Sequence, residues 1–82
     1  MNTATSRWQR YQDRNGDSGI MAVAYEAQGL RVMFRRGPRR QVLFTAGSSG
    51  MQHLIRMAEL ARTGNGLNAY ITRHGVPAAW QA

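Results

Sequence analysis

The 82-residue sequence predicts a single α+β domain, in which a three-stranded antiparallel meander is packed by one amphipathic helix and followed by a second, short C-terminal helix. Two observations predict this fold class. Three short apolar segments joined by Gly-containing links fill the first half of the chain, and apolar residues at three- and four-residue spacing fill the second half. A sheet must bury its apolar face against another element, and the amphipathic helix supplies that cover.

Residues 20–26 form the first predicted strand, because they are mostly apolar and Gly29 follows them in a short hairpin connection. Residues 30–35 form the second, since apolar residues at even positions alternate with Arg or Met at odd positions. Residues 41–45 form the third by composition. Either face of the first strand can point inward, because both are equally apolar. The predicted core combines the strands and the long helix: Ile20, Ala22, Ala24, Leu30, Val32, Phe34, Val42, Phe44, Met51, Leu54, Ile55, Ala58 and Ala61.

The long helix is predicted after a Gly-Ser-Ser-Gly segment. Ser49 and Gln52 have the spacing of a capping box, and Gly64 is placed to end the helix. A second helix is predicted over residues 67–74, with Asn65 as its N-cap; a strand is the alternative there.

Domain organisation follows from these elements. We predict a polar N-terminal arm at residues 1–17, the α+β domain at 18–75 and a C-terminal tail at 76–82.

The longest apolar run, residues 20–25, is far shorter than a membrane span, and the N-terminus lacks the pattern of a signal peptide. We therefore expect a cytoplasmic protein, with a monomer and a homodimer both open.

The positive charge is concentrated in one stretch. All 11 basic residues are arginine, against 4 acidic residues, giving a formal net charge of +7. Residues 1–29 are neutral overall, whereas residues 30–40 contain five arginines and no acid. This clustering of arginines indicates a local binding site for a polyanion.

The sharpest motif is Arg35-Arg36-Gly37-Pro38-Arg39-Arg40, at the predicted turn between the second and third strands. A guanidinium is always charged and binds phosphate in a bidentate manner. The predicted binding residues are the four arginines of the turn and the arginine behind them on the second strand: Arg31, Arg35, Arg36, Arg39 and Arg40. A solvated turn that only aids solubility is the alternative.

Two kinds of protein fit this motif. The first is a non-catalytic protein that binds nucleic acid or a nucleic-acid–protein complex through the turn. The second is a phage or prophage accessory protein of the anti-CRISPR kind, which inhibits a host protein complex by steric occlusion. Its arginines would then pair with acidic residues of the partner or occupy the partner's phosphate-binding channel. Aromatic residues add a further question, because Trp8 and Trp80 in the terminal segments either pack on each other or one of them anchors a partner.

Catalytic and metal-binding patterns are weak, and we expect no enzyme activity, metal or cofactor. The chain has no cysteine, which excludes disulfides and thiolate ligands. His53 and His74 are the only histidines, and a zinc site would need both of them plus carboxylates. Ser48 and Ser49 lie near His53 in the sequence without an orienting acid.

Three stretches of the sequence resemble the KTSC domain family, which is named for a similarity to the C-terminal part of a lysyl-tRNA synthetase. They read S-x-I-x-A-V-x-Y at residues 18–25, L-x-V-x-F-x-x-G at residues 30–37 and G-x-G-L-N-x-x-I at residues 64–71. The third strand and the segment after it depart from the family pattern. The resemblance, over about residues 18–72, implies a compact α+β unit of the kind found in small bacterial or phage proteins and no particular biochemical activity.

Overall fold

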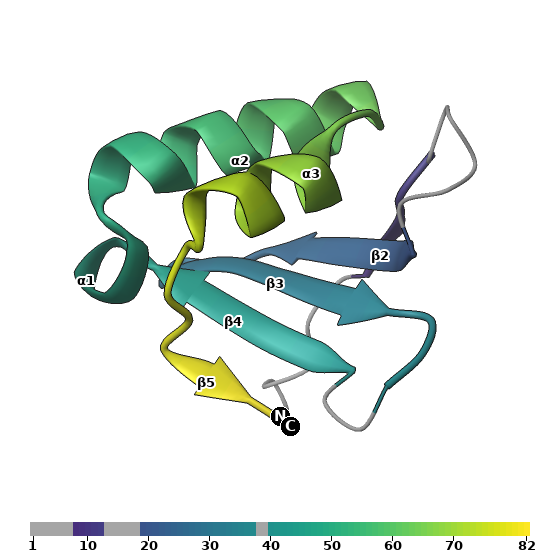
Figure 1. The fold of residues 1–82 in the computed structure, drawn as a ribbon, viewed down its shortest axis with the longest axis horizontal. Coiled ribbons are helices and arrows are strands. Elements are labelled where there is room, and N and C mark those ends of the chain that lie inside the picture. Colours follow the sequence, from purple (N-terminus) through teal and green to yellow (C-terminus); the bar gives the residue numbers. More distant parts are fainter. Residues whose placement is uncertain (1–7, 13–18, 38–39) are drawn as a thin grey trace.

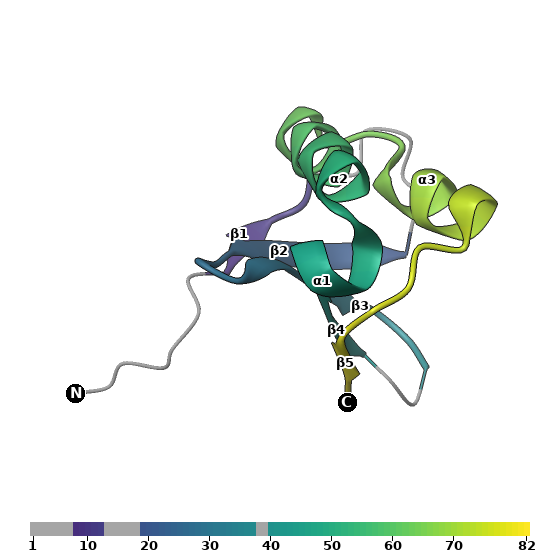
Figure 2. The same ribbon diagram turned by 90° about the vertical axis from the view of Figure 1, so that its left-hand side faces the viewer.

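A computed structural model describes residues 8–12, 19–37 and 40–82. Within them, an antiparallel sheet of five strands in sequential order is covered on one face by helices (Figure 1). The elements along the chain are β1 (Gln9–Arg10), β2 (Ile20–Tyr25), β3 (Gly29–Phe34), β4 (Gln41–Thr45), α1 (Ala46–Ser49), α2 (Met51–Thr63), α3 (Leu67–His74) and β5 (Trp80–Gln81). Figure 2 shows α2 and α3 on the same side of the sheet.

The α+β class agrees with the prediction, but the three-stranded sheet was wrong. The predicted arm contributes β1, which pairs with β2, and the predicted tail contributes β5, which pairs with β4. Each added strand has two residues, too few for an alternating pattern to reveal. Backbone hydrogen bonds extend both pairings: the Tyr11 amide donates to the Met21 carbonyl over 3.1 Å, and the Ala79 amide donates to the Leu43 carbonyl over 2.8 Å.

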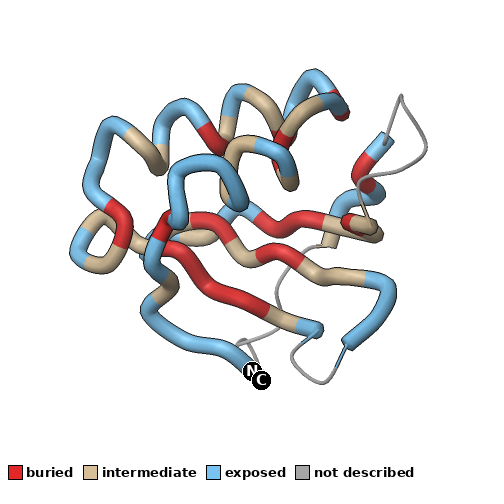
Figure 3. The backbone as a smooth tube through the Cα atoms, in the orientation of Figure 1, coloured by how far each residue is buried: buried red, intermediate tan, exposed pale blue. Residues whose placement is uncertain are grey.

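The strand register separates two faces of the sheet, because residues paired directly across strands share a face. Two rows face the helices: Val23–Val32–Val42 and Tyr25–Leu30–Phe44. Two other rows lie on the opposite face, which we call the open face: Arg10–Ala22–Met33–Gln41 and Ala24–Arg31–Leu43–Trp80. Buried residues run along β2, β3 and β4, where the central rows lie (Figure 3).

A β-bulge in β2 decides which of its residues face the helices. The register shifts between Ile20 and Ala22, so Ile20 and Val23 both join the core although they are three positions apart. The prediction that Ala22 belongs to the core was therefore wrong, because the bulge moves it to the open face, where it is only partly buried. Ala24 is completely buried, as predicted, although its row also lies on that face. No local sequence pattern marks this extra residue.

The segment after β4 folds differently from the predicted capping box. A separate helix, α1, is capped by Thr45 and Ser48, each of whose backbone amides donates to the other's hydroxyl oxygen. Ser49 is buried and donates to the carbonyl of Pro77 over 2.8 Å, so it ties α1 to the chain before β5. Gly50 is the N-cap of α2, and Gly64 is its C-cap in a left-handed conformation, as predicted.

The helix over residues 67–74 is confirmed, but its N-cap is Gly66 instead of Asn65. The buried Tyr11 holds its first turn in place, since the Leu67 amide donates to the Tyr11 hydroxyl over 3.2 Å. This bond connects the N-terminal part of the chain to α3.

The buried side of α2 also differs from the prediction. Met51 and Ile55, expected in the core, are 57% and 54% exposed, whereas Met57 is completely buried beside Ala61. Because α3 packs along α2, the helix turns part of its surface toward α3 as well as toward the sheet. Apolar residues surround much of α2, so their spacing alone could not select the buried side.

Candidate functional surfaces

The basic turn connects β3 to β4 at the end of the sheet away from α1 (Figure 1). The Phe34 amide donates to the Arg40 carbonyl over 2.7 Å, and the Arg35 amide donates to the Gly19 carbonyl over 2.8 Å, which anchors both ends of the turn. Arg35, Arg36 and Arg40 are exposed. The predicted site residue Arg39 lies outside the described residues, as does Pro38. We call the described residues of this turn, 34–37 and 40–41, the basic hairpin.

Arg31, the fifth predicted binding residue, lies apart from the turn. It belongs to the open face, where its guanidinium donates to the Glu26 carboxylate over 2.8 and 3.3 Å. Its guanidinium carbon also lies 5.1 Å from the centroid of the Trp80 ring. Arg31 is therefore already engaged by the protein, and its charge is offset by Glu26.

The two described glutamates pair with arginines outside the basic hairpin. Glu26 contacts Arg31, and Glu59 contacts Arg56 over 3.3 Å on the exposed side of α2. The turn is therefore a region with three exposed arginines, bordered at Arg40 by Ala82, whose oxygen accepts from the Gln41 amide over 3.1 Å. Such a region attracts anions, and the attraction weakens as salt rises.

A hollow on the open face adjoins the basic hairpin. It has a volume of about 310 Å³ and is lined by Met33, Arg40, Gln41 and Ala82. Beyond it lies Trp80, which is 44% exposed on the edge strand. The sequence alternation had placed Arg31, Met33 and Arg35 on one face, but it could not reveal that β5 brings an indole beside them.

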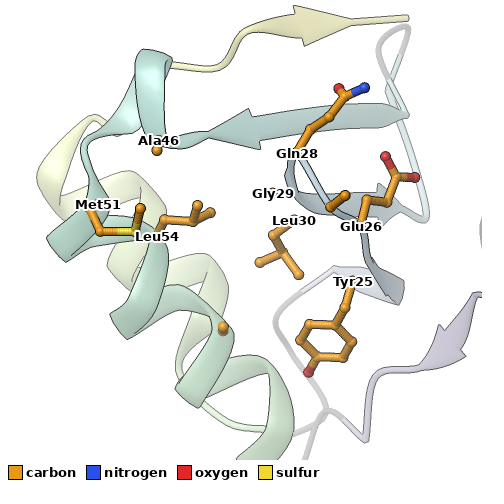
Figure 4. Close-up of a pocket in the computed structure, with 10 residues that line it drawn as sticks. Tyr25, Glu26, Gln28, Gly29, Leu30, Ala46, Met51 and Leu54 are labelled. Atoms are coloured by element: carbon orange, nitrogen blue, oxygen red, sulfur yellow. The ribbon is translucent and has the colours of Figure 1, made fainter.

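An apolar groove lies on the helical side, between α2 and the hairpin that joins β2 to β3. Its volume is about 360 Å³. Figure 4 shows Tyr25, Leu30, Met51 and Leu54 around it, with Glu26 and Gln28 at the hairpin. Burial raises the pKa of the Tyr25 hydroxyl, and the positive charge of Arg62 partly opposes that rise.

The two histidines meet between α2 and α3. The Nδ1 atom of His53 lies 2.6 Å from the Tyr70 hydroxyl, and the His53 and His74 rings are 5.3 Å apart. In the part of the chain that the structure describes, no three His, Cys, Asp or Glu side chains gather as a metal site would require. The cluster instead joins the two helices through ring contacts and one hydrogen bond.

Comparison with known proteins gives one finding. The chain matches no family model, no curated protein and no solved structure. The resemblance to the KTSC domain therefore stays a prediction from the sequence. None of the described helices combines the length and the apolar character that crossing a membrane requires.

Proposed function

We propose that this protein is a non-catalytic, cytoplasmic nucleic-acid-binding protein that contacts phosphates through the basic hairpin. One observation carries the proposal. Arg35, Arg36 and Arg40 are all exposed and lie within a single turn. An uncharged turn at this end of the sheet would not attract a polyanion.

The contact chemistry follows from the side chains. Guanidinium groups form short, charge-assisted hydrogen bonds to phosphate oxygens, often two at a time. Contacts to phosphate position a protein on nucleic acid without reading its sequence. We therefore expect binding that depends weakly on sequence and strongly on salt.

A triple substitution tests the proposal. Arg35→Ala, Arg36→Ala and Arg40→Ala together remove three charges from the basic hairpin, and the matched control is Arg56→Ala with Arg62→Ala and Arg73→Ala on the helices. Binding to labelled DNA and RNA, measured by fluorescence anisotropy, should weaken much more in the hairpin variant. Equal weakening in both variants would mean that net charge alone drives binding.

A second candidate is an accessory protein that inhibits a protein complex by covering part of its surface. The apolar groove supports it, because the exposed residues Met51 and Tyr25 both line it, and the exposed Ile55 lies four residues after Met51 on α2. Exposed apolar clusters commonly mark protein interfaces. The Ile55→Glu variant should abolish capture of a protein partner and leave nucleic-acid binding intact, whereas the hairpin variant should retain capture if the groove is the interface.

A further inference from the structure

We propose that the open face of the sheet binds single-stranded nucleic acid, with bases stacked at Trp80 and phosphates held at the basic hairpin. This inference rests on the proposed function and names the form of nucleic acid that the same region takes. Three neighbouring features carry it: a flat aromatic platform, a hollow and a cluster of cations.

Trp80 and Arg31 form the platform. The indole is nearly half exposed, and the guanidinium of Arg31 lies against its ring at 5.1 Å. Two hydrogen bonds from the guanidinium to Glu26 hold it in place. Indole rings and guanidinium planes both stack on unpaired bases, and stacking accepts every base because each has a π face.

The hollow separates this platform from the basic hairpin. Met33 and Gln41 line it and form the next row of the open face beyond Arg31 and Leu43. Arg40 also lines the hollow, and it begins the hairpin's return into β4. Platform, hollow and hairpin thus follow one another along the strand direction.

The spacing suits an extended strand of a few nucleotides. Arg31 and Arg35 are four residues apart on β3 and its continuation, which corresponds to about 13 Å at the usual rise of a strand. A single strand can place its bases on the platform and in the hollow while its backbone passes the arginines. The bases of a duplex are stacked and paired internally, so a duplex offers its phosphates to the hairpin but no base to Trp80.

The experiment compares substrates and variants together. Oligo(dT), oligo(U) and a duplex of the same length are titrated with the wild-type protein and with Trp80→Ala, Trp80→Phe and Gln81→Ala. Gln81 is the matched control, because it is the exposed neighbour of Trp80 and belongs to a row on the opposite face of the sheet. Trp80→Ala should weaken single-strand binding about 5- to 150-fold and leave duplex binding unchanged. Trp80→Phe should retain most of the affinity, and unchanged duplex binding by Trp80→Ala would show that a change in folding does not cause the loss.

Fluorescence supplies an independent readout. The chain contains two tryptophans, so a Trp8→Phe background leaves Trp80 as the reporter. Saturation with oligo(dT) should quench its emission, and saturation with duplex should not. The two oligonucleotides separate DNA from RNA, since a contact to the 2′-hydroxyl would favour oligo(U).

The outcomes distinguish this inference from the function on which it rests. If the wild-type protein binds neither single strands nor duplex, the proposed function and this inference both fail. If it binds through the hairpin arginines but Trp80→Ala leaves single-strand affinity and emission unaffected, only this inference is overturned. An equal loss on single strands and duplex would overturn it as well.

Discussion

Arg31 and Trp80 meet across an intervening strand: β4 runs between β3 and β5, yet the guanidinium lies 5.1 Å from the indole centroid. Leu43 is the β4 residue between them in the same row, and it is only 7% exposed although it lies on the open face. The two long side chains therefore close over Leu43. This contact attaches the two-residue strand β5 to the centre of the sheet.

Removing the indole should uncover Leu43 and loosen β5. Trp80→Ala loses the cation–π contact and apolar cover, so we expect a decrease of about 1–2 kcal/mol in the free energy of unfolding. Urea denaturation followed by circular dichroism measures it. Gln81→Ala, in the same strand but in the row that faces away from the open face, should stay within about 0.5 kcal/mol of the wild type. Equal effects of the two substitutions would argue against the bridge over Leu43.

Gly29 should tolerate no larger residue. A Cβ atom at this position would lie 2.0 Å from the carbonyl oxygen of Phe44, which the backbone of β4 holds in place. Gly29→Ala should therefore lower the free energy of unfolding by at least about 2 kcal/mol. Gly47→Ala in α1 is the control, because its Cβ would meet nothing closer than 3.8 Å; we expect it to be neutral or slightly stabilising.

The orientation of α2 gives a third prediction. Met57→Ala should cost about 2–5 kcal/mol, because this side chain is completely buried in the core. Ile55→Ala should change the free energy of unfolding by less than about 0.5 kcal/mol, because Ile55 is exposed. Denaturant unfolding of both variants tests the placement, and a large cost at Ile55 would favour the orientation that spacing alone predicted.

High pH should destabilise the fold through Tyr25. Its pKa is raised, chiefly by burial, so the folded protein favours the neutral phenol more than the unfolded chain does. The contribution of this pKa shift to the stability of the fold is fully present below the ordinary tyrosine pKa of about 10. It is lost as pH rises through the pKa of Tyr25 in the folded protein. The difference in stability between the wild type and Tyr25→Phe should therefore change between neutral pH and pH above about 10. A difference independent of pH would contradict the assignment.

The predictability of the fold depended on the length of each element. The alternation of residues 30–35 and the glycine that ends α2 are local signals, and both predicted what the structure contains. The strands β1 and β5 consist of two residues each, and only long-range pairing defines them. The bulge near Ala22 and the exposure of Ile55 also depend on distant partners, so local spacing gave the wrong core residues there.

The candidate site likewise combines features that the sequence revealed with features that only the fold brings together. The cluster of arginines was visible as a run in the sequence, and the structure places Arg35, Arg36 and Arg40 at one turn. The association of Arg31 with Glu26 and Trp80 was not visible, because it joins one loop to two strands that are not neighbours in the sheet. Only the pairing of β5 with β4 brings Trp80 to the open face.

The salt dependence of duplex DNA binding tests the central claim most directly. The slope of log affinity against log salt counts the phosphates that a protein neutralises, at about −0.9 for each. If Arg35, Arg36 and Arg40 each contact a phosphate, their joint replacement by alanine should make the slope shallower by about 2.7. The triple variant of Arg56, Arg62 and Arg73 should keep the wild-type slope. An unchanged slope in the hairpin variant, or an equal change in the helix variant, would contradict the assignment of the basic hairpin as the phosphate contact.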